Sequence, residues 1–149
     1  MISAAESSIT VFTLDPKEFN RHPAIAVNGA ALPLVRKPML LGVCFDPLFT
    51  FADHAREVAG KVGRCIKVVK VLAGKSLGCS KDTLATTFKA LAKPHLTYGR
   101  PIWPPTITSP SLHRLQSAQN AALRTNTGCF KMSHIDHLHA EASVLPVAH

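Results

Sequence analysis

The chain has 149 residues, which is the length of about one domain and enough to bury a hydrophobic core. Hydrophobic residues make up 46% and charged residues 17% of the sequence, so the composition argues against an intrinsically disordered chain. Seventeen Lys and Arg against nine Asp and Glu give a formal net charge of +8. This excess favours an acidic partner, either nucleic acid or an anionic membrane surface.

The positive charge is concentrated in one segment. Between Arg56 and Arg100, ten basic residues are opposed only by Glu57 and Asp82, so this segment carries the whole excess. The sequence has no run of 18 apolar residues and no secretory signal pattern, so we expect no membrane-spanning helix and no membrane partner. Four widely spaced cysteines without a C-x-x-C pair predict free thiols in a reducing compartment.

The first 48 residues predict a small antiparallel β-sheet. Short β-branched or apolar runs are bounded by turn residues, and Asn28-Gly29 is a strong hairpin signal. Asp15-Pro16 ends the first run and Asp46-Pro47 ends the last one. The predicted strands are residues 8–14, 24–27, 31–35 and 40–45.

From residue 49 onward the spacing of apolar residues becomes that of a helix. The first helix is predicted over residues 51–73, with Thr50 as its N-cap and Gly74 at its end. Its apolar face is predicted from Phe51, Ala55, Val58, Val62, Cys65, Val69 and Leu72. Five cations are predicted on the opposite face: Arg56, Lys61, Arg64, Lys67 and Lys70.

Three more helices are predicted downstream. Ser80 is a suitable N-cap for a helix over residues 81–93, which Pro94 must end or kink. Ser109-Pro110 begins a helix that Gly128 ends, and residues 135–142 form a short fourth helix. The expected fold class is therefore α+β, with a small antiparallel β segment over residues 1–48 and a mainly α-helical, thumb-like bundle over residues 49–149.

The acidic residues are not arranged for metal-dependent catalysis. Polymerase and nuclease chemistry needs two or more carboxylates around Mg²⁺. The close acidic pairs, Asp15/Glu18 and Asp53/Glu57, are typical of a turn and of a helix start, and no two aspartates are adjacent. We therefore predict no catalytic residue and no metal ligand. Zinc is kept as a minor alternative to structural or surface histidines at four residues, Cys129, His134, His137 and His139.

The basic face of the first helix allows three interpretations: a solvated surface, a phosphate-binding surface and a membrane-surface helix. Six cations meet one acid between Arg56 and Lys75, whereas a solvated face usually mixes both signs, so phosphate binding is favoured. A membrane-surface helix would have few bulky apolar anchors besides Phe51 and Leu72. Lys75 lies in a predicted turn between helices and is added as a phosphate contact.

Residues 41–51, with the sequence Leu-Gly-Val-Cys-Phe-Asp-Pro-Leu-Phe-Thr-Phe, resemble the segment that follows the palm in reverse transcriptases of non-LTR (LINE-type) retrotransposons. Further blocks that resemble this family in the same order lie at residues 70–78, 87–91, 96–103, 115–124, 127–129 and 135–139. The resemblance extends from about Ile9 to Pro146. The chain departs from the family pattern at Gly60 and Gly63, where longer or charged residues are usual, and at Thr125-Asn-Thr, where Ala-Thr or a similar pair usually precedes Gly-Cys.

The resemblance implies that the opening strands correspond to the end of the palm and the helices to the thumb and connection. It implies a primer-grip hairpin at Leu41, Gly42, Val43, Cys44 and Phe45. It also implies an RNA/DNA template–primer duplex as the partner, with phosphate contacts from Arg56, Lys61, Arg64, Lys67, Lys70 and Lys75.

The resemblance further implies that the catalytic palm and the fingers lie outside this sequence, before Met1. The Mg²⁺-binding palm motifs, including Tyr-x-Asp-Asp, have no counterpart here, so Mg²⁺ is a cofactor of the intact family enzyme and none is expected in this chain. Our first hypothesis is therefore a fragment that grips nucleic acid and is inactive as a polymerase by itself. The alternatives are a stand-alone basic nucleic-acid-binding module derived from such an element and an active polymerase.

Overall fold

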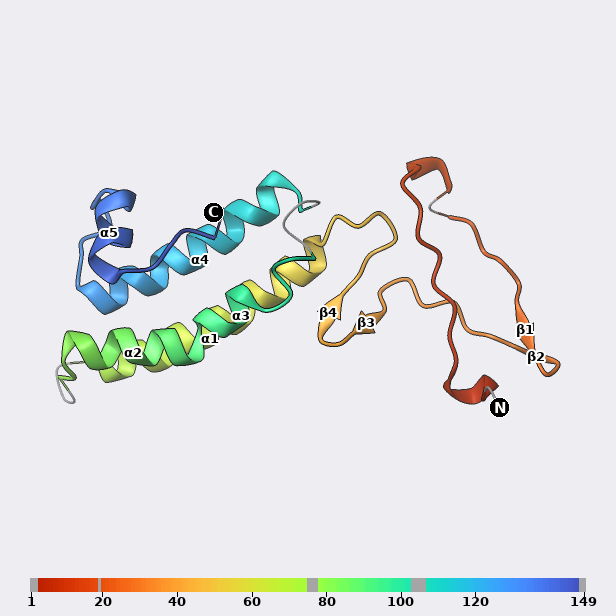
Figure 1. Ribbon diagram of the computed structural model, residues 1–149, viewed down its shortest axis with the longest axis horizontal. Coiled ribbons are helices and arrows are strands. Elements are labelled where there is room, and N and C mark those ends of the chain that lie inside the picture. Colours follow the sequence, from red (N-terminus) through yellow and green to blue (C-terminus); the bar gives the residue numbers. More distant parts are fainter. Residues whose placement is uncertain (1–2, 19, 75–77, 103–106, 148–149) are drawn as a thin grey trace.

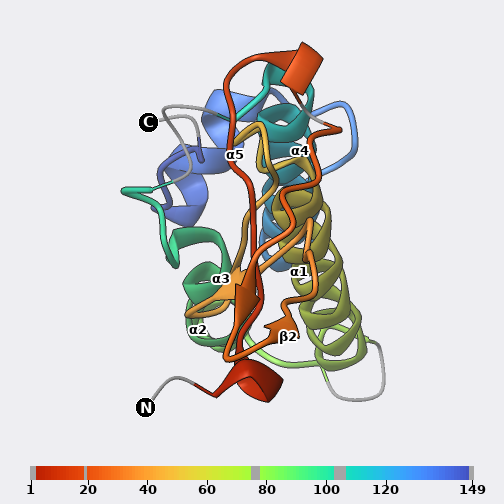
Figure 2. The same ribbon diagram turned by 90° about the vertical axis from the view of Figure 1, so that its right-hand side faces the viewer.

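A computed structural model of the chain describes residues 3–18, 20–74, 78–102 and 107–147. Figure 1 shows a helical part on one side and an extended, strand-containing part on the other, with β4 next to the start of α1. Figure 2 turns this arrangement by 90° and brings the extended part in front of the helices. The elements, in chain order, are η1 (Ala4–Glu6), η2 (Pro16–Glu18), β1 (Ala26–Val27), β2 (Ala30–Ala31), β3 (Met39–Leu40), β4 (Val43–Cys44), α1 (Ala52–Leu72), α2 (Lys81–Leu91), α3 (Lys93–Thr97), α4 (Ser109–Thr127) and α5 (Ile135–Ala142).

The predicted α+β class is confirmed, because helices follow two small antiparallel sheets. In the first sheet β1 pairs with β2, placing Ala26 opposite Ala31 and Val27 opposite Ala30. The turn between them is the predicted one: Asn28 and Gly29 have φ angles of 52° and 79°, and positive values at both central residues match the twist of a tight hairpin.

The strand predicted over residues 8–14 is wrong. Within the described residues only Ile9 pairs there, in an isolated parallel bridge to Leu34. Ile9 donates its N–H to the Pro33 carbonyl at 2.9 Å and accepts from the Val35 N–H at 2.8 Å. The ladder does not extend past Pro33, because proline has no N–H to donate.

Residues 40–45 were predicted as one strand, and this too is wrong. They form a hairpin in which β3 pairs with β4, with Met39 opposite Cys44 and Leu40 opposite Val43. Leu41 and Gly42 make the turn, with φ angles of 47° and 78°. The continuous apolar run conceals this turn, because a leucine with positive φ is uncommon.

The segment that leads into α1 is held by Asp46, which lies outside the helix. Its Oδ1 accepts the Phe51 N–H at 2.7 Å, and its Oδ2 accepts the Thr50 N–H at 3.0 Å and the Thr50 hydroxyl at 2.9 Å. The prediction of Thr50 as N-cap is therefore wrong, since the N-cap position is held by Phe51 with φ 52°. A carboxylate at this end also favours the helix dipole.

The hydrophobic core lies between α1 and α4 and is closed by the other helices. The predicted apolar face of α1 is buried at Ala55, Val58, Val62 and Val69, and Ile66 joins it. Opposite this face lie completely buried side chains of α2, α4 and α5: Phe88, Leu115, Leu123 and Leu138. Burying large apolar side chains such as these contributes about 1.5–3 kcal/mol each.

The predicted signals for the later helices are confirmed. Ser80 Oγ accepts the Thr83 N–H at 3.3 Å, as an N-cap should. α2 ends at Leu91, and Pro94 is the second residue of α3, which begins at Lys93. Gly128 ends α4 with φ 70°, and α5 has the predicted bounds.

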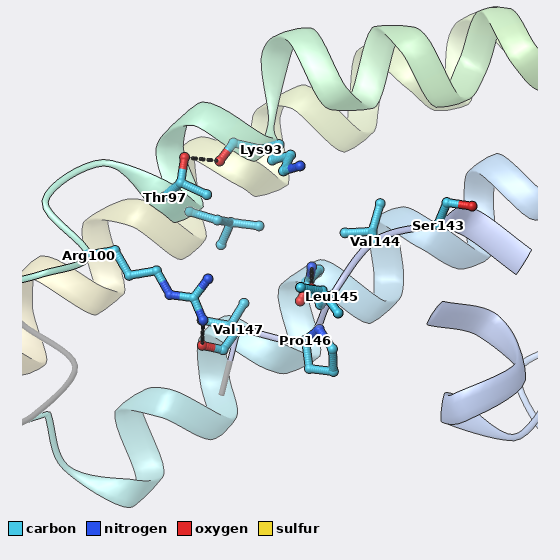
Figure 3. A pocket seen from close by; sticks show the side chains of 10 residues that line it. Lys93, Thr97, Arg100, Ser143, Val144, Leu145, Pro146 and Val147 are labelled. Carbon is cyan, nitrogen blue, oxygen red and sulfur yellow. Dashed lines mark hydrogen bonds between the residues drawn. The ribbon is translucent and has the colours of Figure 1, made fainter. Parts of the chain in front are cut away.

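Residues 143–147 pass back along α4 and are held there by hydrogen bonds to their backbone. Arg100 donates to the Val147 carbonyl at 2.9 Å, as Figure 3 shows. Gln119 donates to the Leu145 carbonyl at 2.8 Å, and Gln116 accepts the Val147 N–H at 2.8 Å. These contacts fasten the end of the described chain to the helical core.

We expect Asp46→Ala to lower the free energy of unfolding by about 2 kcal/mol, because three hydrogen bonds to one carboxylate are lost at the start of α1. Urea denaturation followed by circular dichroism measures this change. The control is Asp15→Ala, which also removes an aspartate before a proline but takes away one exposed hydrogen bond to the Lys17 N–H. Equal effects of the two substitutions would contradict the role of Asp46 in holding the segment that leads into α1.

Candidate nucleic-acid interface

The cations predicted on α1 divide into two groups by exposure. Arg56, Arg64, Lys67 and Lys70 are exposed on the side away from the core. Lys61 differs, since its side chain is 33% exposed and therefore partly buried. Lys75 lies outside the described residues.

The cations of α1 also differ in whether they form ion pairs. Arg56 pairs with Asp53 at 2.5 Å, and Lys61 pairs with Glu57 at 2.7 Å, so acids one turn earlier offset these two charges. Among the residues that the structure describes, Arg64, Lys67 and Lys70 make no ion pair. The unbalanced positive charge of α1 is thus in its C-terminal half.

The two acids of α1 are held in the charged state. The pKa of Asp53 lies below its ordinary 3.8, first because Lys37 donates a hydrogen bond to it and then because of the charges of Lys37 and Arg56. The pKa of Glu57 is lowered first by the hydrogen bond from Lys61. Both carboxylates are therefore ionised and paired with neighbouring cations.

Two glycines leave backbone uncovered beside the exposed cations. A side chain at Gly63 would meet nothing within 4 Å, and at Gly60 it would meet only the end of Arg64 at 4.0 Å. Each glycine destabilises a helix interior by about 1 kcal/mol relative to alanine. The outer surface of α1 is therefore open between its cations, and a phosphate backbone can approach it closely.

The apolar face of α1 is not available to a membrane. The side chains of Ala55, Val58, Val62 and Val69 are at most 4% exposed, and they pack against the other helices. An interfacial helix binds a membrane through a free apolar face. The packing of α1 therefore argues against the membrane-surface interpretation of its charge.

The second predicted site, Leu41–Phe45, contains the β3–β4 hairpin turn and is fixed at two points to the helical part. Tyr98 donates its hydroxyl to the Leu41 carbonyl at 2.6 Å, and a side chain at Gly42 would lie 3.5 Å from the Tyr98 ring. At the other end, the Cys44 N–H donates to His54 Nδ1 on α1 at 3.3 Å. Leu41 itself is 82% exposed.

Burial shifts the pKa values of His54 and Cys44, the two residues that meet at this second contact. Burial is the main reason that the pKa of His54 is lowered, which favours the neutral imidazole that accepts from Cys44. The pKa of the Cys44 thiol is raised, first by burial and then by Asp53 and Glu57, so the thiol stays protonated. A protonated thiol is a weak nucleophile, and this cysteine is suited to packing.

The two predicted sites do not form one cluster. The hairpin lies beside the first turn of α1, whereas Lys67 is fifteen residues further along, about 22 Å at 1.5 Å per residue. A duplex rises about 3.4 Å per base pair, so this separation spans about six base pairs. The two predicted sites are therefore two separate surfaces of the chain.

The histidines have different surroundings. His139 is buried, with Nδ1 2.8 Å from the Val144 carbonyl and Nε2 2.8 Å from Asn120 Oδ1. His134 and His137 are exposed, with ring centres 5.9 Å apart. In the described part of the chain no three His, Cys, Asp or Glu side chains are grouped to hold a metal ion. The sequence analysis allowed a structural role for His139 but did not identify its partners, because Asn120 lies on α4 and Val144 follows α5.

Comparisons of the chain with protein-family models, with curated proteins and with solved structures find no match. Functional arguments therefore rest on the residues of the chain itself. Among the described residues, no helix has the length and apolar content to cross a membrane.

We expect the ion pair between Lys37 and Asp53 to make stability depend on pH in acid. Because the folded-state pKa of Asp53 is lowered, its contribution is fully present above the ordinary value of 3.8 and is lost as the pH falls through the folded-state value. Lys37→Met should lower the free energy of unfolding at pH 7 by less than about 1 kcal/mol. Urea titrations from pH 7 to pH 2 should show this difference disappear in acid.

The matched control for this pH dependence is Lys17→Met, which removes an exposed lysine that makes no ion pair among the described residues. It should leave the acid limb of the stability curve unchanged. A difference between Lys37→Met and wild type that persists at pH 2 would show that the lysine acts through its packing instead of its charge.

Proposed function

We propose that this chain is the thumb-like, nucleic-acid-gripping part of a non-LTR retrotransposon reverse transcriptase, and that it binds a template–primer duplex through the phosphate backbone. The observation that carries the proposal is the exposed surface of α1 with three cations that make no ion pair in the described chain: Arg64, Lys67 and Lys70. The resemblance of residues 9–146 to this family gives the binding surface its context.

The proposed contact works through charge and without base reading. Lysine and arginine neutralise phosphates and release the counterions condensed on a duplex, so binding weakens steeply with salt. The bare backbone at Gly60 and Gly63 allows the strand to lie close to the helix. Contacts of this kind fix the position of a duplex and carry no sequence information.

The hairpin supplies the second part of the proposed grip. Leu41–Phe45 would support the primer end when a palm and fingers are present. The resemblance places the catalytic Mg²⁺ in that palm, and in this chain Asp53 and Glu57 are each engaged by neighbouring lysine or arginine side chains. This chain by itself should show no Mg²⁺-dependent primer extension.

We expect charge reversal at Arg64, Lys67 and Lys70, each to Glu, to weaken binding of a 20-base-pair RNA/DNA duplex by at least tenfold at about 0.1 M salt. The slope of log affinity against log salt concentration should become less steep by about three, since each cation that neutralises a phosphate adds about one to it. Fluorescence anisotropy of a labelled duplex measures both quantities.

The matched control reverses three exposed cations on other parts of the chain, Lys93, Arg114 and Lys131, and changes the net charge equally. Equal weakening by both triple variants would mean that total charge, and not the α1 surface, binds the duplex. Binding that does not respond to salt would contradict the phosphate contacts altogether.

A second candidate function is that of a stand-alone basic nucleic-acid-binding module. The observation that favours it is that α1, α2, α4 and α5 share one buried cluster, which gives the helical part a core of its own. If so, the chain should unfold cooperatively in urea, with slow hydrogen exchange in α1. A broad transition without protected amides would favour a part that needs its palm to fold.

A further inference from the structure

A cavity lies between α3 and the returning segment, residues 143–147. Figure 3 shows Lys93, Thr97 and Arg100 on one side of it and the returning segment on the other. Its volume is about 310 Å³. This is about twice the roughly 150 Å³ in which a protein can hold one benzene ring, and it lies at the lower end of the range for small-molecule sites. The cavity therefore has room for one small ligand.

The charged side chains that line this cavity are all positive. They are Lys93 and Arg100, and no Asp or Glu lines it among the described residues. Arg100 already donates to the Val147 carbonyl at 2.9 Å. Lys93 is exposed, and within the described part of the chain its ammonium group makes no ion pair. A negatively charged group is therefore favoured here, with the Lys93 ammonium as its donor.

The remaining lining of the cavity is largely apolar. Three buried side chains belong to it, Leu96, Val144 and Val147. The Pro146 ring and the methylene chain of Lys93 are more exposed and add apolar surface that a ligand can cover. A phosphate or sulfate ion would leave this surface uncovered and would find few donors. A ligand with one carboxylate and an apolar body suits the lining better.

Thr97 adds a hydrogen-bond acceptor next to the positive charge. It follows Lys93 by four residues on α3, so the two side chains lie on the same face. The Thr97 hydroxyl donates its hydrogen to the Lys93 carbonyl at 3.1 Å. Its oxygen keeps lone pairs, to which no donor of the described chain is bonded. The site thus presents a positive donor and a neutral acceptor side by side.

The last residue of a peptide has the complementary groups. Its carboxylate, its amide N–H and its side chain all branch from one Cα atom. The carboxylate can accept from the Lys93 ammonium while the N–H donates to Thr97 Oγ1. An apolar side chain can then cover the apolar lining. Capture of a terminal carboxylate is an established way in which proteins recognise peptides.

We propose that this cavity binds the C-terminal residue of a protein or peptide whose chain ends in an apolar side chain such as leucine. The Lys93 ammonium holds the terminal carboxylate, and Thr97 accepts the last amide N–H. The site uses none of the cations of α1, so it goes beyond the proposed function and does not depend on nucleic-acid binding. It gives the helical part of the chain a docking point for a partner protein.

The first test compares a carboxylate with its neutral counterpart. In ¹⁵N NMR titrations of the full chain, N-acetyl-L-leucine should shift the backbone amides of Leu96, Thr97 and Val144, which line the cavity. N-acetyl-L-leucinamide has the same size without the charge and should bind about tenfold more weakly, because a charge-assisted hydrogen bond is lost. If N-acetyl-L-leucine causes no shifts, or if the two compounds bind equally, the proposal is overturned.

The second test removes the ammonium group. Lys93→Met keeps most of the apolar chain and should weaken N-acetyl-L-leucine by about tenfold. The matched control is Lys131→Met, which removes another exposed lysine without an ion pair among the described residues and should leave the affinity unchanged. Both positions are exposed, so neither substitution disturbs the core. An unchanged affinity in Lys93→Met would overturn the role of the ammonium group and with it the proposal.

The third test separates a peptide end from a free carboxylic acid. Isocaproate has the carboxylate and the branched body of leucine but lacks the amide N–H, so it should bind about fivefold more weakly than N-acetyl-L-leucine. Thr97→Val removes the acceptor oxygen at nearly the same size and should abolish this difference. If isocaproate binds wild type as tightly as N-acetyl-L-leucine, the assignment to a peptide end is overturned.

Discussion

The hydrogen bonds accepted by the Asp46 carboxylate set the geometry of the whole chain. They join the hairpin segment to the first turn of α1, and they stabilise a connection in which Phe49 and Phe51 both have positive φ. Aromatic packing supports the same corner, since the Phe12 and Phe49 rings stack with centres 4.9 Å apart. These contacts fix how the hairpin meets α1, and the proposed two-point grip on a duplex would depend on this arrangement.

The helices could be predicted because their signals are local. The apolar period of α1, the cap at Ser80 and the stop at Gly128 each depend on residues within one or two turns. The predictions failed where non-glycine residues take up positive φ. Thr50 is not the N-cap because Phe51 holds that position with φ 52°, and the turn at Leu41 is hidden in an apolar run.

The candidate sites also combine features that the local sequence predicts with features that depend on tertiary packing. The exposed cations of α1 could be predicted from charge spacing, and the neutralisation of Arg56 by Asp53 and of Lys61 by Glu57 follows from spacings of three and four residues. The hydrogen bond between His139 and Asn120 could not be foreseen, because it depends on how α5 packs on α4. Such packing has no signature in the local sequence.

The glutamines of α4 that bind residues 145 and 147 affect how the sequence of this chain can diverge. Gln116 and Gln119 grip residues 145 and 147 by their main-chain atoms, so the hydrogen bonds do not depend on which side chains those residues carry. Leu145 is 74% exposed and free to vary, whereas Val144 and Val147 are constrained only by the size of the space that they fill. Drift should therefore accumulate in the returning segment while the glutamines that hold it stay fixed.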